Sequence, residues 1–194
     1  MAAPSIPTKA DLRARALAAR LAMTADARDE AAAAITQAVL DVPEVIAAGC
    51  VAAYLSFGTE PATPHLVAEL RSRGVRVLVP VLRSDLDLDW TEYGDKTVNA
   101  QNAGRWSTPD GPLLGLGAIT GADVVLVPAL AVDARGMRLG RGGGSYDRAL
   151  TRVPPARPVL ALLYDGERPA VVPAEPHDRP VTGVVTPRGV LRFA

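Results

Sequence analysis

Short apolar runs alternate with helical segments along this chain, and the alternation constrains its fold more than any other feature. Residues 49–55 form an apolar run that is typical of a buried strand. Thr63 and Pro64 then provide an N-cap and a first helical residue for a helix that we expect to end at Arg73. The next apolar run, 75–80, predicts a second strand. This β-α-β order predicts a mostly parallel sheet covered by helices.

Two further helices precede the first strand. Thr8 followed by Asp11 is typical of a capping box, and apolar residues continue at helical spacing as far as Met23. Thr24 offers an N-cap for an alanine-rich helix at 26–40. Further apolar runs predict strands at 87–93, near a sheet edge, and at 123–128, 159–163, 183–186 and 190–193, with a long loop at 96–116. We therefore predict one α/β domain over residues 1–194.

Composition excludes several classes of protein. The formal net charge is +0, which argues against a general nucleic-acid binder. The single cysteine, Cys50, excludes an internal disulfide and lies in an apolar run, so we expect a core thiol. No apolar stretch approaches the ~20 residues of a membrane span, and no signal peptide is recognisable. We expect a cytoplasmic monomer or weak homodimer without nucleic-acid or membrane partners.

Ligands of open parallel sheets bind beyond the carboxyl ends of the strands. This rule selects residues 56–60, 80–83 and, above all, the segment after Pro128. That segment contains Gly136, Gly140, Gly142, Gly143 and Gly144. Glycine lets the backbone take positive φ and approach a ligand closely, and arginine binds phosphate oxygens.

The glycine-rich segment, with Arg138 and Arg141 and a helix start, predicts a polyphosphate cradle. It has no lysine, so it is not a Walker loop, and it matches the dinucleotide fingerprint poorly. A flexible surface loop with incidental glycines is the alternative. Asp147, in the first turn of the helix, and Asp178 are candidate Mg²⁺ ligands, or else a helix-terminal charge and a turn residue. Lys9 and Arg13 share one helix face, which is either solvated or bridged by an anion.

The segment 138–147, following 127–133, closely resembles the signature of the 5-formyltetrahydrofolate cyclo-ligase family. The resemblance extends to Lys9 with Leu12 and Arg13, to 54–56 with Glu60 and Thr63, to Trp106 with Pro109, and to His177-Asp178 with 184–186. It implies a single three-layer α/β/α domain. It also implies an ATP-dependent, Mg²⁺-requiring conversion of 5-formyltetrahydrofolate to 5,10-methenyltetrahydrofolate with release of ADP and phosphate.

The resemblance also implies roles for individual residues. ATP would be bound by Lys9, Arg13, Arg138, Leu139, Gly140, Arg141, Gly142, Gly143, Gly144, Ser145 and Tyr146. The folate would contact Leu55, Glu60, Trp106, Arg141, Gly142, Gly143, Gly144 and Ser145. Mg²⁺ would be bound by Asp147 and Asp178, while Arg138 and Arg141 would neutralise charge during phosphoryl transfer.

The chain departs from the family pattern within the glycine loop. Ser145 stands where many members have a tyrosine, Arg141 also replaces a tyrosine of many relatives, and Gly143 occupies a position where some have a lysine. We expect Arg141 to compensate for that missing charge. Two other functions stay open: a non-catalytic folate or nucleotide binder, and a sugar-phosphate or CoA enzyme on a similar fold.

Overall fold

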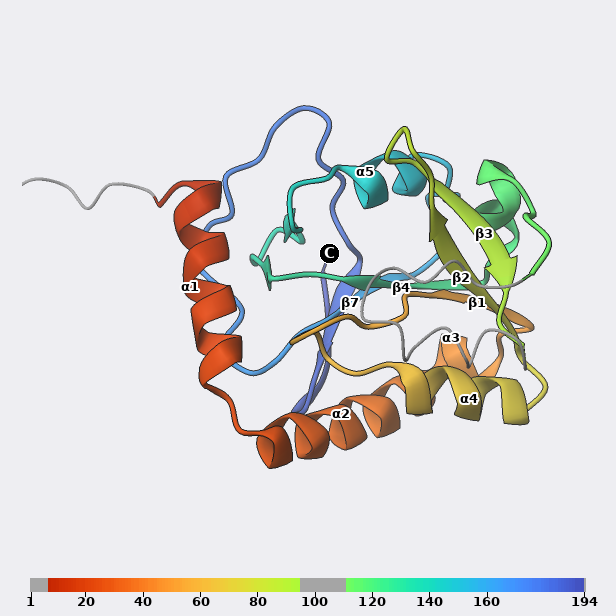
Figure 1. The fold of residues 1–194 in the computed structure, drawn as a ribbon. Coiled ribbons are helices and arrows are strands. Elements are labelled where there is room, and N and C mark those ends of the chain that lie inside the picture. The colour runs from red at the N-terminus through yellow and green to blue at the C-terminus, as the bar shows by residue number, and fades with distance from the viewer. Residues whose placement is uncertain (1–6, 95–110, 194) are drawn as a thin grey trace, which may run out of the picture.

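The computed structural model describes residues 7–94 and 111–193, and its centre is a seven-stranded mixed sheet (Figure 1). The strand order is β3-β2-β1-β4-β7-β8-β9. The five inner strands are parallel: β2 (Arg76–Leu82), β1 (Cys50–Ala53), β4 (Val124–Pro128), β7 (Val159–Leu162) and β8 (Gly183–Thr186). The edge strands β3 (Leu88–Glu92) and β9 (Gly189–Arg192) are antiparallel to their neighbours. The predicted mostly parallel sheet, with 87–93 at an edge, is confirmed.

Helices cover both faces of this sheet. In the view of Figure 1, α2 (Ala25–Leu40), α3 (Pro43–Ile46) and α4 (Pro64–Ser72) lie below it. The short helix α5 (Ser145–Leu150) and the 3₁₀ helix η2 (Leu116–Gly121) lie above it. The layers therefore follow the predicted α/β/α order. The assignment of the whole chain to one domain stays a prediction.

Helix α1 (Lys9–Ala22) stands apart from both layers, at the left of Figure 1. Its N-terminus has the predicted capping box, in which Thr8 and Asp11 exchange hydrogen bonds. Its other end is anchored by Arg20, which is 1% exposed. Arg20 donates to the carboxylate of Glu167 at 2.6 and 2.7 Å and to the carbonyl of Ala129 at 2.6 Å. Because Ala129 directly follows β4, the helix is fixed beyond the carboxyl ends of the strands.

The sequence patterns missed three short elements. Two are α3, which begins at Pro43 just after the predicted helix at 26–40, and η2, which begins at the end of the predicted loop. The third is a hairpin of β5 (Ala131–Val132) and β6 (Arg138–Leu139) within the glycine-rich segment. Its turn is organised by Asp133, whose buried carboxylate accepts from the backbone N–H groups of Arg135, Met137 and Val172.

The hairpin turn also requires glycine at one position. Gly136 has φ 77°, and a Cβ added there would collide with the carbonyl of Val181. Only glycine satisfies both constraints without strain. The hairpin thus fixes the direction in which β6 delivers Arg138 and the glycines that follow it.

The main core is built from valine, leucine and alanine of the inner strands, packed against α2 and α4. Cys50 is buried there as a free thiol, as predicted. Within residues 7–94 and 111–193, no helix is long and apolar enough to cross a bilayer.

Candidate active site

A cavity of about 430 Å³ lies beyond the carboxyl ends of β2 and β4, where the strand-end rule predicts a ligand. Its walls come from α1, from the segments that follow β1, β2 and β4, from the glycine loop (residues 140–144) and from the loop at 175–178. The lining residues are Lys9, Arg13, Glu60, Leu82, Leu86, Pro128, Ala129, Leu130, Arg138, Leu139, Gly140, Arg141, Gly142, Gly143, Gly144, Ser145, Tyr146, Asp147, Glu175, His177 and Asp178.

The glycine loop joins β6 to α5, and close contacts explain part of its composition. A Cβ at Gly140 would lie 2.7 Å from Nη1 of Arg138, so a larger residue would displace that guanidinium. Gly142 has φ 106° and Gly144 has φ 68°, which side chains rarely permit. The predicted helix does follow the loop, but it has only six residues, 145–150. The N–H groups of the loop and the neighbouring arginines, rather than a long helix, are therefore the main anion-binding features.

Arg138 lies beneath this loop and is 5% exposed. Its Nη2 donates to Oδ1 of Asp147 at 2.9 Å, and its Nη1 donates to the carbonyl of Pro128 at 3.4 Å. The guanidinium also stacks over Tyr146, with Cζ 5.8 Å from the ring centre. Its Nε is buried and has no partner among the described residues. Arg138 thus lines the cavity in an orientation that Asp147 fixes.

Lys9 and Arg13 reach the cavity from α1, and each has a defined partner. Nζ of Lys9 lies 2.7 Å from Asp178 and 3.2 Å from Glu175. Although burial opposes the charge, the hydrogen bonds to these two carboxylates raise the pKa of Lys9 above its ordinary value. Nε of Arg13 donates to the carbonyl of Gly140 at 3.0 Å. The helix face that carries Lys9 and Arg13 is therefore not simply solvated. Carboxylate oxygens balance the charge of Lys9, and a carbonyl oxygen binds Arg13, without an added anion.

The two candidate metal ligands lie on adjoining segments of the cavity wall. The backbone N–H of Arg179 donates to Oδ1 of Asp147 at 3.3 Å, which brings the loop that carries Asp178 against α5. Within the described part of the chain, no group of three or more His, Cys, Asp or Glu residues could hold a metal. Two carboxylates fit magnesium, because its sites commonly combine one or two carboxylates with substrate phosphates and water.

Arg141 and Glu60 form an ion pair on the side of the cavity that the segment after β1 provides. Nε of Arg141 donates to Oε1 of Glu60 at 2.9 Å, and the N–H of Phe57 donates to Oε2. The nearby hydroxyl of Tyr146 is buried without a partner among the described residues. Burial, together with the charge of Glu60, raises the pKa of Tyr146 far above its ordinary value. Tyr146 is therefore a neutral hydroxyl group beside a carboxylate.

Comparison with known proteins gives this geometry a context. A family model described as the 5-formyltetrahydrofolate cyclo-ligase family matches residues 5–187. The chain belongs to this family. A 5-formyltetrahydrofolate cyclo-ligase of Mycolicibacterium smegmatis is 44% identical over 147 residues, which are 73% of this chain and 75% of the relative. The cyclo-ligase of Escherichia coli is 31% identical over 178 residues, covering 90% of this chain and 97% of the relative.

Two solved structures share the fold. The 5,10-methenyltetrahydrofolate synthetase of Aquifex aeolicus has a TM-score of 0.77 at 23% identity, covering 95% of this chain and 92% of that one. The synthetase of Mycoplasma pneumoniae has a TM-score of 0.74 at 19% identity, covering 92% and 98%. At these identities the likeness shows the fold alone, which is the α/β fold that the resemblance implied.

The cavity of this cyclo-ligase family member gathers most, but not all, of the residues expected in the site. Leu55 packs against the main core and is not part of the cavity lining. Trp106 lies outside the described residues. Sequence reasoning did not assign Leu86, Glu175 or His177 to the site, although His177 belongs to one of the segments that carry the resemblance. Glu175 and His177 could have been found from their closeness to Asp178, whereas Leu86 reaches the site only because β2 and β3 form a hairpin.

Proposed function

We propose that this chain converts 5-formyltetrahydrofolate and ATP to 5,10-methenyltetrahydrofolate, ADP and phosphate. One observation carries the proposal: the glycine loop, Arg138 and two aspartates border a single cavity at the carboxyl end of the sheet. Glycine N–H groups and an oriented arginine can hold a triphosphate, and the aspartates can hold its magnesium. The names of the cyclo-ligase relatives agree with this function.

ATP would lie along the glycine loop, with Lys9 and Arg13 on one side and Arg138 on the other. Arg138 is held in place by Asp147, so it can meet a phosphate without first being ordered. Lys9 would exchange part of its contact with Glu175 for a phosphate oxygen. That bond is the longer of its two, and the Glu175 side chain is 55% exposed.

Asp147 and Asp178 would hold Mg²⁺. Both recorded bonds to Asp147 end on Oδ1, so among the described residues Oδ2 accepts no hydrogen bond. When bound, the ion would neutralise phosphate charge and so assist transfer of the γ-phosphoryl group.

The chemistry requires positioning rather than a protein nucleophile. The formyl oxygen attacks the γ-phosphorus, the bond to the bridging oxygen breaks, and ADP leaves with that electron pair. N10 of the folate then bonds to the activated carbon and loses its proton, and the C–O bond breaks to release phosphate. Arg138 and the loop N–H groups stabilise the developing negative charge, and the cavity holds N10 near the carbon.

Arg141 would act at the folate rather than at the phosphates. Its bond to Glu60 joins a glycine-loop cation to a carboxylate expected to contact the folate. Arg141→Ala should therefore raise the KM for 5-formyltetrahydrofolate more than the KM for MgATP. The reverse pattern would support the phosphate role expected from the sequence.

The decisive assay mixes the protein, MgATP and 5-formyltetrahydrofolate and follows the near-ultraviolet absorbance of methenyl-folate. We expect product that depends on ATP and is lost with EDTA. Arg138→Ala should lower kcat by about 10²–10³-fold, as loss of a charge-stabilising donor does. The control is Arg157→Ala, because Arg157 pairs with Asp123 at the opposite, amino end of the strands.

Each alternative function predicts a different outcome of the same assay. Tight folate binding without product would favour a non-catalytic binder. Binding of a phosphosugar with no response to ATP would favour a sugar-phosphate enzyme. Either result would overturn the proposed reaction.

A further inference from the structure

The turn between β2 and β3, residues 83–87, contributes one wall of the cavity through Leu86. The turn is held internally, because the N–H of Arg83 donates to the carbonyl of Asp87 and the N–H of Leu86 donates to that of Arg83. Leu86 has φ 64°, a conformation that a leucine rarely adopts, and its side chain is 49% exposed. Residues held in such sparsely populated conformations cluster at functional sites.

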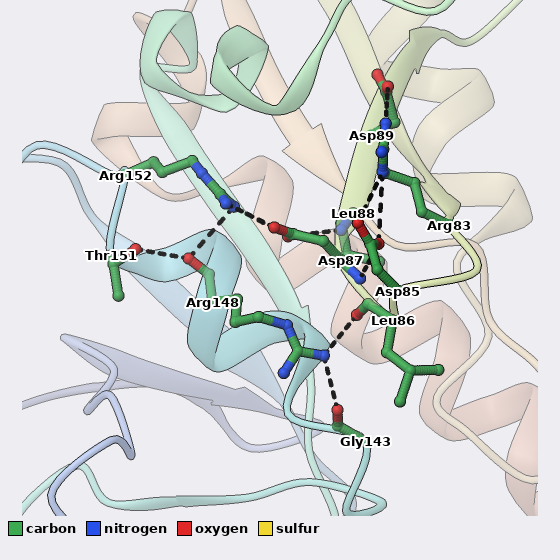
Figure 2. Close-up of polar contacts among 10 residues, drawn as sticks. All are labelled: Arg83, Asp85, Leu86, Asp87, Leu88, Asp89, Gly143, Arg148, Thr151 and Arg152. Carbon is green, nitrogen blue, oxygen red and sulfur yellow. Dashed lines mark hydrogen bonds and ion pairs between the residues drawn. The ribbon is translucent and has the colours of Figure 1, made fainter.

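Two arginines one helical turn apart attach α5 and the residues just after it to this turn, as Figure 2 shows. Arg152 makes a two-pronged ion pair with Asp87, with distances of 3.0 and 2.6 Å. Arg148 reaches the same turn differently. Its Nη2 donates to the carbonyl of Leu86 at 2.7 Å and to the carbonyl of Gly143 at 2.9 Å. One nitrogen therefore joins the turn to the glycine loop.

The contact with Gly143 fixes a peptide plane. The C=O and the following N–H of a trans peptide point in opposite directions. Holding the Gly143 carbonyl toward Arg148 therefore directs the N–H of Gly144 away from Arg148. The fit is close, since a Cβ on Gly144 would lie 3.2 Å from Nη1 of Arg148. Glycine has no Cβ that would restrict rotation of this peptide, so the contact with Arg148 is what holds it.

We propose that Arg148 is a positioning residue that sets the Gly143–Gly144 peptide against the β2–β3 turn, so that two walls of the cavity meet the ligand as one preformed unit. Arg148 does not belong to the cavity lining and would act through the loop. That the ligand is the triphosphate of ATP rests on the proposed function.

Arg152 provides a matched control because it contacts the same turn from the same segment but does not touch the glycine loop. Its partner Asp87 is buried, and the bond from Arg152 lowers the pKa of that carboxyl. Removing Arg152 leaves a buried carboxylate without its cation, so the loss should appear in stability. Arg148 is exposed and bonds to two carbonyls, so its loss should appear in loop order.

The experiment compares Arg148→Ala, Arg148→Lys and Arg152→Ala with the wild type. The first readout is the NMR order parameter of the Gly144 amide, which needs no activity. We expect it to fall from about 0.85 to below about 0.6 in Arg148→Ala only. Arg148→Lys should restore it, because an ammonium group can donate to both carbonyls.

The second and third readouts are thermal stability and steady-state kinetics. Arg148→Ala should raise the KM for MgATP about tenfold, below the ~100-fold that a 1 Å misplacement can cost, and shift the melting midpoint by less than ~2 °C. Arg152→Ala should lower the midpoint by more than ~5 °C and change that KM less than about twofold.

An unchanged Gly144 order parameter in Arg148→Ala would overturn the proposal, as would a KM change no larger than that of Arg152→Ala. A wild type that makes no methenyl-folate would overturn the proposed function instead. The order parameter would then still decide whether Arg148 positions the loop.

Discussion

The two ends of helix α1 carry similar cations that the fold uses in opposite ways. Lys9, at the N-terminal end, is partly exposed, and its partners Asp178 and Glu175 line the cavity. Arg20, at the C-terminal end, is buried between Glu167, the carbonyl of Ala129 and the ring of Tyr164. In the proposed function Lys9 would exchange a partner for a ligand, whereas Arg20 cannot move without exposing a buried carboxylate. Burial, rather than residue type, separates the proposed binding end of α1 from its anchored end.

The largest effect should come from breaking the anchor. Arg20→Met leaves Glu167 buried without its cation, which should lower the free energy of unfolding by about 3–5 kcal/mol. Urea denaturation measures this loss. The double variant Arg20→Met/Glu167→Gln should recover a large part of it, because no buried charge then remains. If Arg20→Met lowered the free energy of unfolding by less than about 1 kcal/mol, Arg20 would not anchor α1.

A smaller effect should come from the binding end. Lys9→Met should raise the KM for MgATP about tenfold, as expected when one charge-assisted contact to phosphate is lost. Initial rates at varied MgATP measure it. Arg15→Ala is the control, since Arg15 is an exposed arginine of the same helix outside the cavity lining. Equal KM values in the two variants would remove Lys9 from the ATP site.

The smallest effect concerns the cap that begins α1. Hydrogen bonds from the hydroxyl and the N–H of Thr8 lower the pKa of Asp11. A lowered pKa means that the stabilisation is complete above the ordinary value of about 3.9 and is lost as pH falls through the folded-state value. The melting midpoint of Asp11→Asn should therefore lie slightly below that of the wild type at pH 7, and the gap should close below pH ~4. A gap that widened in acid would contradict the capping role.

Much of the fold could be predicted from the sequence, because its strands are apolar runs and its longer helices have caps. Thr8 and Thr24 were sufficient to predict the starts of α1 and α2, and the apolar run at 123–128 was sufficient to predict β4. The β5–β6 hairpin was missed because its two-residue strands are too short to show periodicity. The helix at Pro43 was missed because a proline can begin a helix as well as end one.

The candidate site was predicted less completely than the fold. The glycine loop, both aspartates and Glu60 border one cavity, and their roles stay predictions. The anchoring role of Arg20 gave no signal, because its partner Glu167 lies 147 residues away and no local pattern reveals such a pairing. Arg148 gave no signal either, since its contacts depend on where the β2–β3 turn is placed in space.

Helix α1 also has a consequence for the order in which the protein matures. Asp178 is synthesised 169 residues after its partner Lys9, and Glu167 is synthesised 147 residues after its partner Arg20. Strands β1, β2, β4 and β7 can pair before either partner has been synthesised, but the wall of the cavity at 175–178 can form only afterwards. The cavity should therefore form later during synthesis than most of the sheet.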